Sequence, residues 1–230
     1  MHIFLFHRDL RLNDNTTLIQ QLQKYDKIIP IFIFPPEQIN PQSNKYFSNN
    51  SVQFMIESLH ELSQSIKEKN GHMYFFKGST MSVLKSIHKM KGIDSIAFNV
   101  DYTPYAIQRD DEIKEWCKEN KIDCMSAEDY LLHDILENAT AKSDGNPYQV
   151  FTPFKEHCQK TLEVRAVNKF RNFKFENAET LTKNGYYIKE ADIDRFYREN
   201  PNVHIHGGRK NGLNILKNVG KFKDYDKDRN

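Results

Sequence analysis

The sequence alternates short apolar runs with longer segments of helical period, and this alternation constrains the fold more than any other feature. Five apolar runs fall in the first 130 residues, separated by segments whose apolar residues recur every three or four positions. This is the pattern of βαβ units, in which a helix connects each strand to the next parallel strand. The pattern predicts strands at 3–6, 28–34, 73–76, 95–100 and 123–126, and helices at 15–25, 52–69, 79–90 and 105–119.

Right-handed crossovers place such helices on both faces of the sheet. The predicted fold class is therefore α/β: a Rossmann-like, doubly wound, five-stranded parallel sheet, followed by a linker and a short helical C-terminal segment. The alternation stops near residue 131, and the turn-rich stretch KSDGNP lies at 142–147. We predict an α/β domain at 1–130, a linker at 131–203, and the incomplete start of a helical domain at 204–230.

Two later segments are basic. Residues 160–175 carry five basic side chains, one acidic side chain and three phenylalanines, and are interpreted as a solvated connector over the first domain. The last 27 residues hold seven Lys or Arg against three Asp, around one short apolar helix face. A single helix cannot bury its own apolar face, so the first domain, a second copy or a separate polypeptide is expected to cover it.

The composition excludes several classes of protein. A charged fraction of 28%, an aromatic fraction of 12% and a net charge of +2 are typical of a globular chain and argue against strong binding of duplex DNA. The sequence holds neither an apolar run long enough to span a membrane nor a signal peptide, which predicts a soluble, intracellular protein. Three cysteines without metal-ligand spacing predict neither a disulfide framework nor a metal site.

The sequence lacks a glycine-rich phosphate loop and the HExxH and GxSxG motifs of metalloproteases and serine hydrolases. Charged residues instead follow two predicted strands: Arg8 and Asp9 after the first, and Asp101 after the fourth, with Arg109 on the next helix. Ligands of doubly wound sheets bind where the strand order reverses, here between strands one and four. We therefore expect these residues to face one crevice; the alternative is that they pair with one another and only fix loops.

Five segments resemble the DNA photolyase and cryptochrome family. HRDLRLNDN (7–15) is similar to the family's first loop, R-R-D-L-R-L followed by D-N, and DYTPYAIQRD (101–110) resembles its fourth strand and following helix. VFTPF (150–154) resembles a segment at the edge of the interdomain linker. HGGRKNGLNILKNV (206–219) and YDKDRN (225–230) are similar to the start of the family's helical domain.

The resemblance implies a function and a set of site residues. In that family the first domain can hold a light-harvesting antenna chromophore, and the helical domain holds FAD and repairs ultraviolet-induced pyrimidine dimers in DNA. Position by position, Asp101 and Arg109 match residues that line the antenna pocket in deazaflavin-type members, and Arg8 and Asp9 match the loop beside it. Ala106 stands where folate-type members have a glutamate, which favours a deazaflavin or FMN-like chromophore over a folate and leaves an empty pocket open. Tyr225 matches a tyrosine that touches the flavin, and Arg229 an arginine four residues on.

The FAD phosphate-binding segment, the tryptophan chain and the DNA-docking groove of the family have no counterpart in these 230 residues. The resemblance therefore predicts the antenna part of a deoxyribodipyrimidine photolyase-like protein, without catalytic residues of its own. It is expected to be inactive without a separate flavin-binding helical half, to use FAD only when that half is supplied in trans, and to meet DNA only through such a complex. The alternatives are a non-catalytic Rossmann-like module that binds a nucleotide or flavin, and a degenerate photolyase relic.

Overall fold

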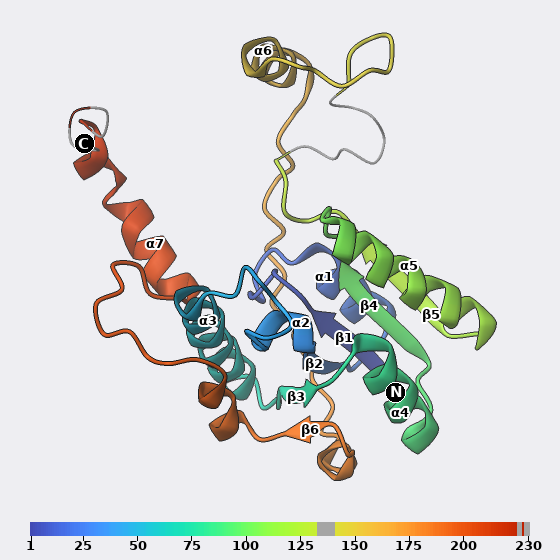
Figure 1. The fold of residues 1–230 in the computed structure, drawn as a ribbon. Helices are drawn as coiled ribbons and strands as arrows, with labels where there is room; N and C mark the ends of the chain where they lie inside the picture. Colours follow the sequence, from blue (N-terminus) through green and yellow to red (C-terminus); the bar gives the residue numbers. More distant parts are fainter. Residues whose placement is uncertain (133–140, 225–226, 228–230) are drawn as a thin grey trace.

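A computed structural model describes residues 1–132, 141–224 and 227, and contains a six-stranded sheet in the order β5-β4-β1-β2-β3-β6 (Figure 1). Five strands run parallel and confirm the predicted strands to within one residue at each end: β1 (His2–Phe6), β2 (Ile29–Phe34), β3 (Tyr74–Lys77), β4 (Ser95–Asn99) and β5 (Asp123–Ala127). The sixth, β6 (Tyr187–Ile188), pairs antiparallel with β3. The apolar pattern does not predict β6 because two residues are too few to show a period.

The four predicted helices cover both faces of the sheet, as expected for a doubly wound fold (Figure 1). The first face packs against α1 (Thr16–Lys24) and α3 (Asn49–Lys67). The second packs against α4 (Thr80–Lys91) and α5 (Pro104–Glu119). Side-chain caps begin all four helices; Thr103, for example, accepts a hydrogen bond from the Ala106 amide at 3.3 Å.

Alternate residues of the central strands β1 and β2 face opposite sides of the sheet, with phenylalanines on one face and isoleucines and a leucine on the other. Phe4, Phe6, Phe32 and Phe34 belong to the cluster under α1 and α3, whereas Ile3, Leu5, Ile29, Ile31 and Ile33 belong to the cluster under α4 and α5. All nine are buried. A strand that is apolar at every position fits only a sheet that is covered on both sides, so this pattern fixes the layer arrangement.

The segment after residue 141 adds elements at the margins of the sheet. Its helices are α6 (Phe151–Thr161) and α7 (Arg209–Lys217), and its 3₁₀ turns are η1 (Glu179–Lys183), η2 (Glu190–Phe196) and η3 (Val219–Phe222). One further short helix, α2 (Pro36–Ile39), follows β2. In Figure 1, α6 and α7 stand away from the sheet. The helix α7 confirms the predicted C-terminal helix. Within the described part of the chain, no helix has the length and apolar character needed to cross a membrane.

Part of the predicted linker belongs to the hydrophobic core. Phe173, Phe175 and Ile193 join the cluster under α1 and α3, and Leu181 joins the opposite cluster. Phe175 also forms a parallel bridge with Ile28. The interpretation of residues 160–175 as a solvated connector therefore fits the exposed stretch before Phe173 but not its end, because the two phenylalanines are buried by the sheet. The boundaries of the three predicted regions stay predictions.

A charged cluster fastens η2 to α3. His60 Nε2 lies 2.9 Å from Asp194 Oδ1, and Lys67 Nζ lies 2.8 Å from Glu190 Oε2. The hydrogen bond to Glu190, together with the nearby Asp194, raises the pKa of His60 to about 9. Burial acts to raise the pKa of Glu190, but hydrogen bonds from His60, Lys67 and Ser63 outweigh burial and lower this pKa to about 2. The cluster holds Ile193 of η2 in the core.

We predict that His60→Gln destabilises the chain in a pH-dependent way. The folded-state pKa of His60 lies above the ordinary value of 6.5, so its contribution is complete below about pH 6.5 and is lost as the pH rises through about 9. Because the side chain is partly exposed, we expect a loss of only about 0.5–1 kcal/mol in the free energy of unfolding near pH 6. Urea denaturation across this range measures it.

His204→Gln is the matched control, because His204 is an exposed histidine of the same half of the chain. A loss for His60→Gln that is as large above pH 9 as at pH 6 would contradict the ion-pair account.

Candidate functional site

A pocket of about 310 Å³ opens at the carboxyl ends of β1, β2 and β4. Its floor is apolar and its rim is polar. The lining residues are Leu5, Phe6, His7, Arg8, Phe32, Ile33, Pro35, Glu37, Gln38, Thr80, Asp101, Thr103, Tyr105, Ala106 and Arg109. The strand order reverses between β1 and β4, so the pocket lies at the switch point where the sequence analysis expects a crevice.

One side of the rim is formed by an ion pair between Arg8, which follows β1, and Asp101, which follows β4. Arg8 Nη1 lies 3.4 Å from Asp101 Oδ1, and the same oxygen accepts a hydrogen bond from the Tyr102 amide at 2.7 Å. The Asp101 side chain is 8% exposed, whereas that of Arg8 is 68% exposed. Asp101 is thus buried in the wall, while Arg8 is an exposed cation at the opening whose guanidinium has one long contact, with Asp101.

Arg109 enters the pocket from α5 and is held on two sides. Its Nε and Nη2 donate to Asp110 Oδ1 at 2.9 and 2.7 Å, and Nη2 also lies 3.0 Å from His7 Nδ1. Burial and the charge of Arg109 hold the pKa of His7 well below its ordinary value, so the ring is neutral near pH 7 and accepts from Arg109 through Nδ1. The proton of the neutral ring is then on Nε2.

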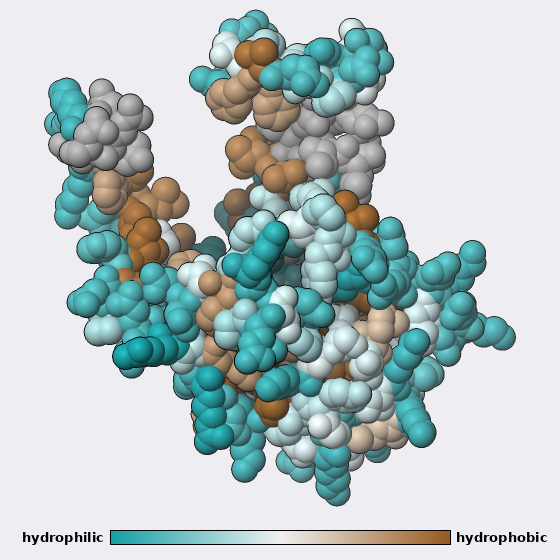
Figure 2. Space-filling model, viewed as in Figure 1, coloured by the Kyte–Doolittle hydropathy of each residue, from teal (hydrophilic) through white to brown (hydrophobic). Residues whose placement is uncertain are grey.

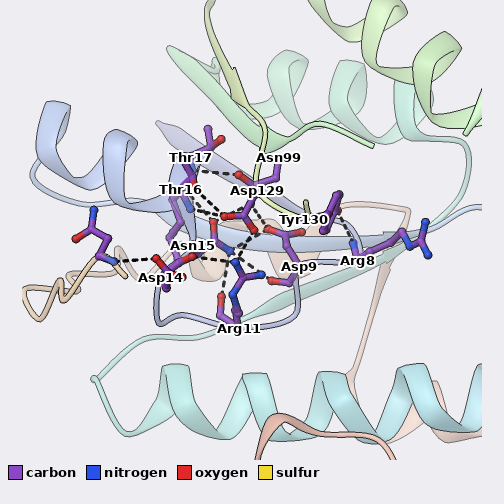
Figure 3. Close-up of polar contacts among 12 residues, drawn as sticks. Arg8, Asp9, Arg11, Asp14, Asn15, Thr16, Thr17, Asn99, Asp129 and Tyr130 are labelled. Atoms are coloured by element: carbon purple, nitrogen blue, oxygen red, sulfur yellow. Dashed lines mark hydrogen bonds and ion pairs between the residues drawn. The ribbon is translucent and has the colours of Figure 1, made fainter. Parts of the chain in front are cut away.

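Asp9 lies in a buried polar network behind the pocket and not in its wall (Figure 3). It is 1% exposed. Its Oδ1 accepts from the His7 amide at 2.9 Å, and its Oδ2 accepts from Asn15 Nδ2 at 2.9 Å and Asn99 Nδ2 at 2.6 Å. Burial raises the pKa of Asp9, and these hydrogen bonds oppose that rise. Because Asn99 ends β4 and Asp9 follows β1, the network joins the two strand exits on either side of the switch point.

A second carboxylate, Asp129, extends this network to α1 and to the segment after α6. It accepts from Arg11 Nη2 at 2.6 Å and from the amide and hydroxyl of Thr16 at 2.8 and 2.7 Å. Arg165 lies 3.5 Å from Asp129 and 2.7 Å from Asp14. The loop after β1 is therefore fixed from three directions, and with it the backbone that carries His7 and Arg8.

The structure brings together three of the five predicted site residues, Arg8, Asp101 and Arg109, at one pocket. Asp9 sits behind it, and Tyr225, like Arg229, lies outside the described residues. Sequence reasoning missed His7, Glu37, Gln38 and Thr80 as lining residues. The polar residues directly after β2 and β3 were a usable signal, because the same strand-exit rule that selected Arg8 and Asp101 applies to them.

The pocket suits a planar heteroaromatic ring. Its phenylalanine, isoleucine and leucine floor offers apolar contact, and its rim offers hydrogen-bonding groups of both kinds. His7 Nε2 and Asp110 Oδ2 are buried polar atoms that lack a hydrogen-bond partner within the described structure. Asp110 does not line the pocket, and polar backbone groups lie near both side chains, that of Asn99 near His7 and that of Asp101 near Asp110.

The fold is thus a doubly wound α/β domain with a pocket at the switch point, which is where sheets of this class bind their ligands. The chain belongs to the DNA photolyase family, because the family model described as DNA photolyase matches residues 2–172. This confirms the resemblance noted from the sequence.

Similar proteins include both photolyases and cryptochromes. Cryptochrome-1 of Aedes aegypti is 24% identical over 216 residues, covering 88% of this chain and 39% of that protein. The deoxyribodipyrimidine photo-lyase of Agrobacterium fabrum is 26% identical over 152 residues, covering 66% of this chain and 30% of that protein. This chain thus spans well under half the length of these relatives.

Among solved structures, an archaeal photolyase from Sulfolobus tokodaii, described with two FAD molecules and a novel light-harvesting cofactor, is 34% identical with a TM-score of 0.78. The match covers 93% of this chain and 45% of that chain. A cryptochrome from Synechocystis sp. PCC6803 has the same TM-score at 17% identity, which shows the shared fold alone.

We predict that Asn99→Ala destabilises the fold through the network behind the pocket. The substitution removes donors to Asp9 and Asn15 and an acceptor for the Thr17 amide, which lies 3.1 Å from Asn99 Oδ1. Buried groups left without partners cost about 2–3 kcal/mol in the free energy of unfolding. Urea denaturation at pH 7 measures the loss.

Asn13→Ala is the control, because Asn13 is an exposed asparagine of the same loop. A change below about 0.5 kcal/mol for Asn99→Ala would show that the network does not stabilise the chain.

Proposed function

We propose that this chain is the antenna part of a photolyase-like or cryptochrome-like protein, and that its pocket holds a flavin-type chromophore. The observation that carries the proposal is the apolar pocket at the switch point, with Arg8, Asp101 and Arg109 at its rim. The Sulfolobus tokodaii photolyase, which is described with two FAD molecules, supports a flavin-type ligand over a folate. A bound chromophore of this kind supplies absorption of near-ultraviolet and visible light and passes the excitation to a second flavin.

The residues of the pocket have separate roles in this proposal. The apolar lining residues, among them Phe6, Phe32 and Ile33, would contact the ring system and exclude water. Arg109 would hold the His7 ring in place through its contact with Nδ1. Asp101, whose Oδ1 is engaged by Tyr102 and Arg8, would accept from an N–H group of the ligand through its other oxygen.

The repair of pyrimidine dimers requires a second, flavin-binding half. We infer that α7 is where that half joins. Gly207 and Gly208 place the start of α7 directly on α3: the Gly207 amide donates to Glu57 at 2.6 Å, and the Gly208 amide donates to Ser58 at 2.9 Å. A Cβ on Gly207 would lie 2.0 Å from the Phe54 carbonyl oxygen.

Beyond this attachment the apolar face of α7 is uncovered. Figure 2 shows hydrophobic residues gathered along the arm that Figure 1 labels α7. The exposed apolar side chains of this arm are Leu213, Ile215, Leu216, Val219 and Phe222. An apolar helix face of this kind needs a partner surface, and the basic residues around it favour an acidic one. Light-driven DNA repair is then an activity of the assembled halves.

We predict that the purified chain binds riboflavin and that Ala106→Leu weakens this binding by at least about tenfold, because the added carbons fill the pocket beside Arg109. Quenching of flavin fluorescence measures the dissociation constant, and circular dichroism confirms that the variant is folded. Ile107→Leu is the matched control, since Ile107 is the next residue of α5 and is exposed.

Equal riboflavin affinity for Ala106→Leu and the unsubstituted chain would place the ligand elsewhere. If riboflavin, a deazaflavin and a folate all fail to bind, the antenna assignment is wrong and a non-binding relic becomes the better account.

A separate prediction concerns assembly. When this chain is co-expressed with a polypeptide that carries the flavin-binding helical half of a photolyase, the two should co-purify, and Leu216→Asp should abolish the complex. Leu216 is 63% exposed, so the substitution leaves the fold of this chain intact. Asn214→Asp adds the same charge to the opposite side of α7 and should have no effect. Retention of the complex by Leu216→Asp would remove α7 from the interface.

A further inference from the structure

We infer that the pocket recognises the uncharged ring system of its chromophore and does not select for a phosphate. This inference rests on the proposed function, because it concerns the ligand class of the same pocket. It is argued from the size of the pocket, the balance of charges in its wall, and the engagement of its cations.

The size of the pocket sets the first limit. A volume of about 310 Å³ is at the lower end of the roughly 300–1,000 Å³ found for pockets that enclose drug-sized ligands. It holds one fused ring system, and leaves a ribityl phosphate or an adenine nucleotide in solvent. Selection for a phosphate would therefore need cations at the rim.

The charges of the rim cancel. Two arginines, Arg8 and Arg109, face two carboxylates, Asp101 and Glu37. His7 adds no charge near pH 7, because burial and Arg109 hold its pKa well below the ordinary value. The field of Glu37 reaches into the pocket: burial, and then the charge of Glu37, raise the pKa of the lining residue Tyr105. A polyanion finds no net positive potential here.

The cations are also engaged. Arg109 gives two hydrogen bonds to Asp110, and its side chain is 13% exposed. Arg8 is paired with Asp101. Compared with a phosphate loop, which offers a run of free backbone amides and a lysine, this rim offers one exposed guanidinium that already has a carboxylate beside it.

The helix N-termini at the pocket give no further anion site. Glu37 lies in the first turn of α2, so a carboxylate already occupies the positive end of that helix. Asp101 precedes α5, and Thr103 caps it through the Ala106 amide. Ser79 caps α4, which carries the lining residue Thr80. The carboxylates Glu37 and Asp101 are accordingly the residues that make the pocket indifferent or adverse to phosphate.

The test compares lumiflavin, riboflavin and FMN, which share the isoalloxazine ring and add in turn a ribityl chain and a phosphate. Titration of the full chain at pH 7, followed by flavin fluorescence, should give three dissociation constants within about threefold of one another. The FMN constant should change by less than about threefold between 0.05 and 0.5 M salt, because no phosphate contact is screened.

Glu37→Gln removes one rim carboxylate and should raise the affinity for FMN relative to riboflavin by about threefold. Asp111→Asn is the matched control: it removes a carboxylate from an exposed position of α5 that does not line the pocket, and should leave the ratio unchanged.

The outcomes separate this inference from the proposed function. FMN binding more than about tenfold tighter than riboflavin, with loss of that preference in Arg8→Gln, would overturn the inference and leave the antenna pocket standing. Lumiflavin binding more than about tenfold weaker than riboflavin would also overturn it, because the ribityl chain and not the ring would then be recognised. If none of the three flavins binds, the proposed function itself fails.

Discussion

The structure depends on the burial of both faces of one parallel sheet. The phenylalanines of β1 and β2 face α1 and α3, and the isoleucines and leucine of the same strands face α4 and α5, with all of them at or below 6% exposure. Each buried side chain of this size contributes about 2–3 kcal/mol through the hydrophobic effect. The helices have no other place to bury their apolar stripes, so the sheet fixes the position of every strand exit. The pocket is assembled from those exits.

The loops at the carboxyl ends of β1 and β4 are held by polar groups, which the apolar pattern of the sequence does not reveal. A carboxylate as buried as Asp9 is tolerated only because the His7 amide, Asn15 and Asn99 all donate to it. Asp129 likewise accepts hydrogen bonds from Arg11 and Thr16. The loop after β1 is therefore rigid, and a rigid loop is what keeps His7 and Arg8 at fixed positions in the pocket. Of the site residues predicted from the sequence, Arg8, Asp101 and Arg109 line the pocket, whereas Asp9 supports the loop behind it.

The chain belongs to the DNA photolyase family and spans less than half the length of the cryptochrome and photolyase relatives that it matches. The two parts of the chain that stand away from the sheet, α6 and α7, contrast with its compact α/β region (Figure 1). The α/β region has a complete core and a pocket. The arm at α7 has an attachment to α3 and an uncovered apolar face. The chain thus combines an α/β region with a two-sided core and a helix whose apolar side chains are exposed.

The sequence by itself determined the order and kind of the main elements and the edge of the sheet at which the pocket opens. Periodicity decides these, because a strand buried on both faces and a helix with one apolar stripe leave different local patterns. The family motifs placed Arg8, Asp101 and Arg109 at one site, and the structure brings them to one pocket.

Only the tertiary structure decided which charged residues face the pocket and which support it. Asp9 and Arg8 are neighbours in sequence, yet one is buried in a network and the other is mostly exposed at the rim. His7, Asn99 and Asp129 contact partners 90 to 118 residues away. The burial of Phe173 and Phe175 in the predicted linker also depends on residues that are distant in the sequence. Local sequence carries no record of such contacts, because they form only when distant strand exits meet.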